Sequence, residues 1–124
     1  MKIYNVDALG KPLGPYSHVA RVKSGELLFI AGMVAPGDSF DAQCAGVFAQ
    51  IEKALASAGA GWGNVAQFTT YLVHSQDIPK LMQWRQREFP KMFPNGAYPP
   101  NTLLIIDRLV QEQFRIEVQV IAAL

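Results

Sequence analysis

The strongest constraint in this sequence is an alternation of helical and strand-like apolar patterns along one chain that contains no linker. After Pro36-Gly37, apolar residues recur at intervals of three and four, which predicts a helix with a buried stripe of Cys44, Val47, Phe48, Ile51, Leu55 and Ala58. Asp38 or Ser39 is expected to cap its start, and Gly59 is expected to end it. A helix of this kind between strand-like segments must bury its apolar face against a sheet or another helix.

A second helix is predicted after a cap at Ser75 or Asp77. Pro79 falls in its first turn, where a missing amide hydrogen costs little, and Pro90 is expected to kink or end it. Its stripe consists of Ile78, Leu81, Met82, Arg85 and Phe89. Because Arg85 interrupts an apolar stripe, its side chain either snorkels to the edge of the helix or points a fixed cation into a cleft.

The other apolar segments have the β-branched and aromatic content of strands. They cover residues 19–23, 27–33, 68–73, 102–106 and 114–122, with a small additional strand at residues 3–4. The first two of the five flank Ser24-Gly25 and predict a β-hairpin. The chain is therefore expected to form a single domain over residues 1–124, of the α+β class, with a mixed β-sheet and two helices packed on one face.

Charged residues are scarce for a domain of this size. Lys and Arg number 11 against 10 Asp and Glu, 17% of the 124 residues, where about 25% is usual. Two helices on one face of a sheet leave the other face uncovered. We therefore expect that face to be buried against other copies of the chain.

The charge pattern and the length of the apolar runs also exclude two classes of partner. The basic residues are scattered and the net charge is +1, so no basic face for nucleic acid is predicted. No apolar run approaches the ~20 residues that cross a membrane. Because the start of the sequence lacks the apolar core of a signal peptide, a cytoplasmic location is expected.

Few side chains offer catalytic or metal-binding chemistry. His18, His74 and Cys44 are widely separated, so neither a metal site nor a cofactor motif is predicted. Cys44 lies on an apolar stripe and is interpreted as a buried thiol rather than a reactive one. Residues 14–18 bring a phenol, a hydroxyl and an imidazole into one rigid turn, which either lines a site or only leads into the first strand.

Seven short segments stand out along nearly the whole chain. They are Gly14-Pro15-Tyr16-Ser17, Leu28-Phe29-Ile30-Ala31-Gly32, Ala58-Gly59, Val65 with Thr69-Thr70-Tyr71-Leu72, Met92-Phe93-Pro94 with Tyr98-Pro99, Arg108-Leu109, and Arg115-Ile116-Glu117-Val118 with Ile121-Ala122. In this order and spacing they resemble the Rid family, the reactive-intermediate deaminases also called YjgF-like proteins. The resemblance implies a chorismate-mutase-like subunit in a homotrimer, with the sheets facing inward and a small-molecule ligand in each cleft between neighbouring subunits.

The resemblance also implies an activity. Active members hydrolyse imines or enamines to a ketone and ammonia without cofactor or metal. Glu117 matches the glutamate that orients and activates water, and Tyr16 matches the pocket tyrosine. The substrate-binding positions fall on His18, Ala31, Gly32, Gln86, Asn101 and Leu103.

Asn101 is the main departure from the family pattern. The family's arginine, which holds a substrate carboxylate, falls on this residue, and an amide cannot supply a guanidinium fork. Ala31 and Leu103 also replace more polar pocket residues. We therefore expect a hydrolytic deaminase of a small imine, enamine or related activated compound, whose carboxylate is absent or held elsewhere, rather than a standard 2-imino-acid deaminase. The alternatives are a non-catalytic ligand-binding or regulatory trimer and, with less support, a ribonuclease.

Overall fold

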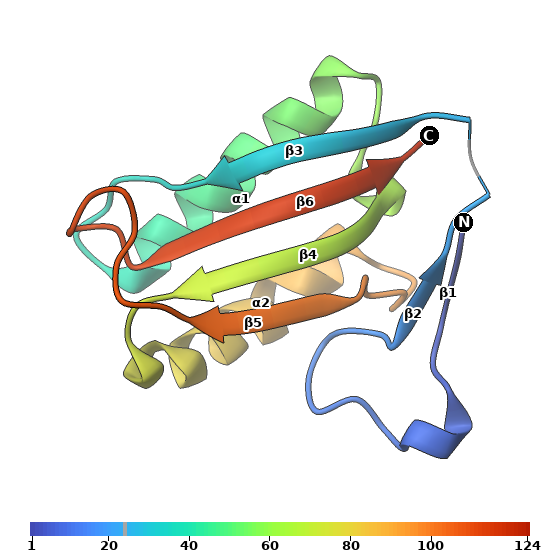
Figure 1. Cartoon of the computed structure of the whole chain (residues 1–124), viewed down its shortest axis with the longest axis horizontal. Coiled ribbons are helices and arrows are strands. Elements are labelled where there is room, and N and C mark those ends of the chain that lie inside the picture. The colour runs from blue at the N-terminus through green and yellow to red at the C-terminus, as the bar shows by residue number, and fades with distance from the viewer. Residues whose placement is uncertain (24) are drawn as a thin grey trace.

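The elements of the chain form one mixed sheet, a small ribbon and two long helices (Figure 1). A computed structural model describes residues 1–23 and 25–124. The strands are β1 (Lys2–Tyr4), β2 (Val19–Arg21), β3 (Leu27–Met33), β4 (Val65–Leu72), β5 (Asn101–Ile105) and β6 (Ile116–Ala123), and the helices are α1 (Phe40–Ser57) and α2 (Ile78–Met92). Single turns of 3-10 helix cover Asp7–Leu9, Trp62–Asn64 and Ser75–Asp77.

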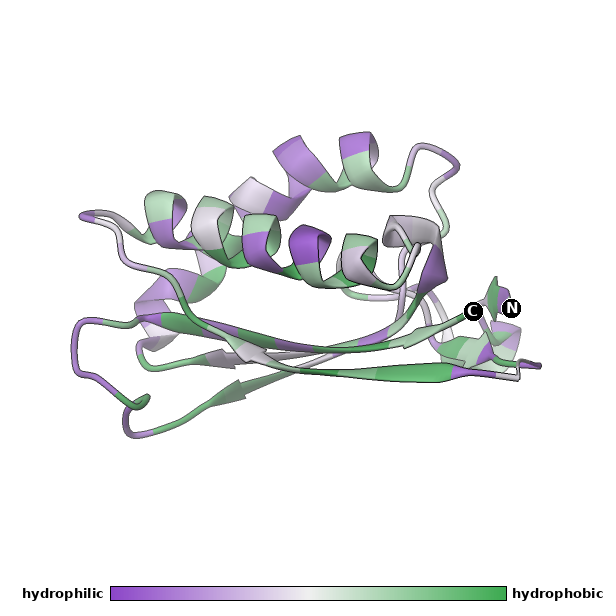
Figure 2. Ribbon diagram, turned by 90° about the horizontal axis from the view of Figure 1, so that it is seen from above, coloured by the Kyte–Doolittle hydropathy of each residue, from purple (hydrophilic) through white to green (hydrophobic). Residues whose placement is uncertain are grey.

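The main sheet has the order β3-β6-β4-β5. β6 pairs antiparallel with both β3 and β4, whereas β4 and β5 are parallel. Both helices lie on the same side of this sheet (Figure 2), which confirms the predicted α+β class with two helices on one face. Neither helix among the described residues is long and apolar enough to pass through a membrane.

The core lies between the helices and the facing side of β4 and β6. Phe48 of α1 stacks on Trp84 of α2 with ring centroids 4.6 Å apart, and its edge meets Phe68 of β4. Side chains of β6 alternate as far as Ala122, so that Ile116, Val118 and Val120 are fully buried in this layer. The apolar stripes predicted for the two helices are therefore the surfaces that cover the sheet.

The ends of the helices agree with most of the signals in the sequence. Ser39, one of the two expected caps, accepts a hydrogen bond from the amide of Ala42 at 3.0 Å. Gly59 has a φ of 71° and follows the end of α1, where only glycine adopts a left-handed conformation without strain. Pro90 does not end α2, which continues to Met92. A proline this close to the end removes only one backbone hydrogen bond, and the next turn still closes from Phe93 to Phe89.

The predicted hairpin between the first two long strand segments is wrong. β2 pairs with β1 in the separate ribbon, and β3 pairs with β6 across the main sheet. Ser24 of the predicted turn lies outside the described residues. Pairing with β6 places Ile30 opposite Val120 in the core, and this burial outweighs a local turn.

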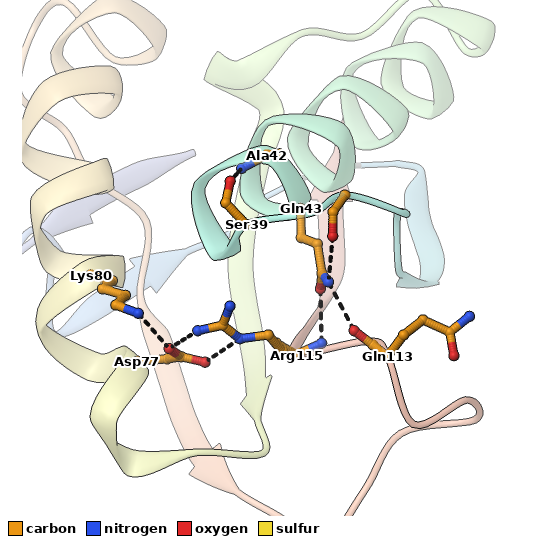
Figure 3. Close-up of polar contacts among 8 residues, drawn as sticks. Ser39, Ala42, Gln43, Asp77, Lys80, Gln113 and Arg115 are labelled. Atoms are coloured by element: carbon orange, nitrogen blue, oxygen red, sulfur yellow. Dashed lines mark hydrogen bonds and ion pairs between the residues drawn. The ribbon is translucent and has the colours of Figure 1, made fainter.

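A buried ion pair ties the start of α2 to the start of β6 (Figure 3). Asp77 is 1% exposed, and it accepts hydrogen bonds from Nε and Nη2 of Arg115. Gln43 of α1 accepts from the backbone amide of Arg115 at 2.8 Å and donates to the carbonyl of Gln113 at 2.9 Å. These contacts, which the sequence did not suggest, hold three elements in one arrangement.

Neither helix covers the opposite face of the sheet, which is here called the open face (Figure 2). Phe29 of β3 is 73% exposed there, and its register partner Ile121 points the same way. Glu117 and Gln119 of β6 alternate with the buried side chains and also face outward. Burial of this face against other copies of the chain remains a prediction.

Candidate functional site

A pocket of about 450 Å³ opens between α2, β5 and the loop before β2. We call it the Arg85 pocket; its lining consists of Leu13, Gly14, Pro15, Tyr16, Ile78, Met82, Arg85, Asn101 and Leu103. Three predicted site residues therefore meet here: Tyr16, Asn101 and Leu103. The periodicity of each element explains this. Ile78, Met82 and Arg85 share one face of α2, and alternate residues of β5 face the helix.

The sequence left open whether the Arg85 side chain snorkels to the edge of α2 or points into a cleft. The side chain does not snorkel into solvent, because the residue is 3% exposed and lines the pocket. Nη2 donates to Thr70 Oγ1 at 2.9 Å and to Asn101 Oδ1 at 3.1 Å, and the guanidinium lies 5.4 Å from the ring centre of Phe89. A guanidinium therefore does stand beside Asn101, supplied by α2 rather than by β5.

This guanidinium has no carboxylate partner among the described residues. Its Nε is fully buried and finds no hydrogen-bond acceptor in that part of the chain. Burial lowers the pKa of Arg85 to about 10, so the side chain keeps its proton at neutral pH. The Arg85 pocket thus contains a positive charge at neutral pH that no described residue neutralises.

Glu117 lies on the other side of the sheet from this pocket. Asn101 and Leu103 are in register with buried residues of β4, whereas Glu117 projects from the open face. There it packs over Gly32, where an added Cβ would stand 2.6 Å from Oε2 of Glu117. The register of β3 and β6 shifts between Ile30 and Met33, the stretch that contains Ala31 and Gly32.

Within the chain most of the predicted residues therefore form two groups. Tyr16, Asn101 and Leu103 line the Arg85 pocket, and Ala31, Gly32 and Glu117 lie on or beside the open face. Alternation along a strand predicts which residues share a face, but it does not show which face the helices will cover. The two groups come together only if a neighbouring copy brings its open face to the pocket.

Two predicted substrate-binding residues lie outside both groups. His18 accepts a hydrogen bond at Nδ1 from the amide of Val6 at 3.0 Å, and its own amide donates to Asn5 Oδ1. These bonds hold the segment after β1 against the start of β2. Gln86 is exposed, because one position beyond Arg85 turns a side chain by about 100° around the helix.

The remaining chemical groups have structural surroundings. The hydroxyl of Tyr16 accepts a hydrogen bond from the amide of Leu13 at 3.2 Å, which closes the loop at the mouth of the pocket. Cys44 is fully buried, and this burial raises its pKa to about 12, which confirms a buried thiol. No three His, Cys, Asp or Glu side chains in residues 1–23 and 25–124 form a group that could hold a metal ion.

Comparison with known proteins finds one matching family and many similar folds. The model of the endoribonuclease L-PSP family matches residues 7–124. A crystal structure of YyfB from Yersinia pestis, a Rid family protein described as of unknown function, is 25% identical with a TM-score of 0.85, covering 99% of this chain and 98% of that chain. An uncharacterised protein from Pseudomonas aeruginosa is also 25% identical, with a TM-score of 0.68 over 86% of this chain and 98% of that chain. TdcF of E. coli, solved with bound serine, is similar in fold, at 17% identity and a TM-score of 0.71 over 99% of this chain and 98% of that chain.

Proposed function

Because the chain belongs to the endoribonuclease L-PSP family, which includes the Rid and YjgF proteins, we propose that it is a cofactor-independent hydrolytic deaminase of a small imine, enamine or related activated compound. The observation that carries this proposal is the position of Glu117. Its carboxylate packs over Gly32 on the open face and makes no hydrogen bond or ion pair with the described residues. A carboxylate held in this way is available to orient a water molecule.

The proposed reaction needs few groups. A water molecule held by Glu117 attacks the electrophilic carbon of the imine, and the carboxylate accepts a proton from it. The carboxylic acid returns this proton to the nitrogen of the tetrahedral adduct. The C–N bond then breaks to release ammonia, while the hydroxyl of the adduct gives its proton to the carboxylate and forms the C=O bond, so that a protonated imine and one water yield a ketone, ammonia and a proton. Positioning of water against an already electrophilic carbon supplies much of the rate.

A homotrimer would complete the site under this proposal. The Arg85 pocket and Glu117 lie on opposite sides of the sheet in one subunit, so a cleft must join the pocket of one copy to the open face of the next. The 73% exposure of Phe29 supports burial of that face in an assembly. The substrate then lies in a cleft between subunits, with Tyr16 at its mouth.

Ribonuclease activity, which the family description names, has less support. The net charge is +1 and the basic residues are scattered along the sequence. Binding to a phosphate backbone requires basic groups gathered on one face. We therefore do not extend that activity to this chain.

A non-catalytic, ligand-binding trimer is the second candidate. The Arg85 pocket is mostly apolar and lies away from Glu117 within the chain. TdcF, which is similar in fold, was solved with serine bound. This supports the proposal that the pocket binds a small molecule without converting it. In this case a ligand binds in the pocket and is not converted.

Turnover of imines separates the two candidates. The purified protein is mixed with imines generated enzymatically, some with a carboxylate and some without, and release of ammonia or ketone is followed. We expect acceleration over buffer, and a loss of roughly a hundredfold or more in Glu117→Gln, in the range for a general base. The control is Glu112→Gln, an exposed carboxylate before β6, which is expected to leave the rate unchanged. Rates equal to buffer for every imine, or an unimpaired Glu117→Gln, would contradict the proposal.

A further inference from the structure

The unpartnered guanidinium of Arg85 is the least satisfied polar group in the described part of the chain. Buried charges are ordinarily paired, because removing an ion from water is unfavourable unless a partner compensates for the lost hydration. Arg85 is 3% exposed, no carboxylate lies within ion-pair distance of it in the described residues, and Nε has no acceptor there. A cation kept in this way at a pocket wall indicates that an anion from outside the chain completes it.

The hydrogen bonds around Arg85 leave donors free and oriented. A guanidinium has five N–H donors. Those of Nη2 point to Thr70 and Asn101, which leaves Nη1 without an acceptor among the described residues. Nη1 is not among the buried atoms that lack a partner, and Arg85 lines the pocket, so we take Nη1 as the donor that a ligand in the pocket can reach.

Asn101 adds a second donor beside this cation. Its Oδ1 accepts from both Arg85 Nη2 and Thr70 Oγ1, the latter at 2.7 Å, so the amide cannot turn over without losing both bonds. The other end of the amide, Nδ2, is thereby fixed in position, and it donates to no described residue. The pocket thus presents a positive charge and a neutral N–H donor side by side.

We propose that Arg85 and Asn101 form an anion-binding subsite, and that this subsite takes the carboxylate of a small ligand with an apolar body. One carboxylate oxygen accepts from Arg85 Nη1 and the other from Asn101 Nδ2. The apolar body lies against the side chains that make up the rest of the wall, namely Leu13, Pro15, Ile78, Met82 and Leu103. This inference rests on the proposed function and makes it more specific. It implies that the substrate carries a carboxylate, which Arg85 and Asn101 hold.

The test measures binding alone, with benzoate as the probe and benzamide as its neutral isostere. Each is titrated into the purified protein and followed by calorimetry and by amide NMR shifts. We expect benzoate to bind at least tenfold more tightly than benzamide. Arg85→Gln is expected to weaken benzoate roughly tenfold to a hundredfold, the range for a lost hydrogen bond to a charged group. The matched control is Arg87→Gln, an exposed arginine on the same helix that pairs with Asp41, and it should bind as the wild type does.

A second variant keeps the test decisive if Arg85→Gln does not fold. Asn101→Asp places a carboxylate beside Arg85, so it should raise the melting temperature and abolish benzoate binding. Equal binding of benzoate and benzamide, no measurable benzoate binding, or unchanged binding in Asn101→Asp would overturn the inference. The benzoate titration contains no imine, so it is independent of the hydrolysis assay. A protein that binds benzoate but hydrolyses no imine in that assay refutes the proposed activity only. A protein that hydrolyses imines but does not prefer benzoate refutes the subsite only.

Discussion

Replacing Arg85 with methionine should make the folded protein more stable, although it removes the charge from the pocket. Burial lowers the pKa of this side chain to about 10 from an ordinary value above 12. Each pH unit of such a lowering corresponds to about 1.4 kcal/mol, so the buried charge costs the folded state on the order of 3 kcal/mol. Methionine has similar length and no charge, so it removes this cost.

The hydrogen bonds of Nη2 reduce the gain. Two bonds are lost, each worth about 1 kcal/mol net in a typical protein. Their acceptors do not become unsatisfied, because Thr70 Oγ1 still donates to Asn101 Oδ1 at 2.7 Å. The balance is a stabilisation of about 1 kcal/mol, or roughly 4 °C in melting temperature for a domain of this size.

Urea denaturation followed by circular dichroism, at one protein concentration, measures this difference. Arg87→Met is the control, since that exposed arginine should change stability by less than about 0.5 kcal/mol. The difference should also depend on pH. Above about pH 10, folded Arg85 releases its proton before the unfolded chain does, so the unfolded state then binds more protons and the wild type gains stability as pH rises.

The gap between Arg85→Met and the wild type should therefore be constant below pH 9 and shrink above pH 10. A loss of more than about 2 kcal/mol in Arg85→Met would refute this reasoning, because it would show that the guanidinium stabilises the fold and needs no ligand. A gap that does not change with pH would show that burial of the charge is not its cause.

Three further predictions concern the buried ion pair, the residue that packs against Glu117, and the open face. Arg115→Ala should destabilise the protein by about 3 kcal/mol in the same denaturation assay, because Asp77, 1% exposed in the folded protein, loses its main partner and keeps only Lys80 at 3.7 Å; a loss below about 1 kcal/mol would argue against a tight ion pair. Gly32→Ala should lower imine hydrolysis at least tenfold while the melting temperature changes little, because a Cβ there displaces the flexible end of Glu117; an unchanged rate would count against the role of that carboxylate. Phe29→Asp should reduce the assembly to monomers in light scattering, because it places a charge on the open face; an unchanged mass would mean that the interface lies elsewhere.

Most of the secondary structure could be predicted because its signals are local. The intervals of three and four in α1 and α2 identify the faces that cover the sheet, and the predicted strands lie within a few residues of the observed ones. The pairing of strands could not be predicted as well from the sequence. A turn between neighbouring strands predicts a hairpin, yet β3 pairs with β6, about ninety positions away, because that partner buries Ile30.

The candidate site divides in the same way. Glu117 lies within a predicted strand, where it alternates with apolar neighbours, whereas Asn101 lies one position before the predicted strand of residues 102–106 and begins β5 in the structure. The ordered motifs also led to the family. The resemblance could not show that Asn101 has a guanidinium beside it, since Arg85 belongs to a different element.

The sequence by itself determined the helices, the strand segments, the family and the apolar side of each element, since each depends on residue types at short, regular spacing. The tertiary structure alone decided which strands pair, that Glu117 and the Arg85 pocket lie on opposite sides of the sheet, and that Arg85 reaches Asn101. The physical reason is that periodicity orients a side chain relative to its own backbone. Which group it then meets depends on the packing of elements distant in sequence, and packing is decided by the apolar area that the whole chain can bury.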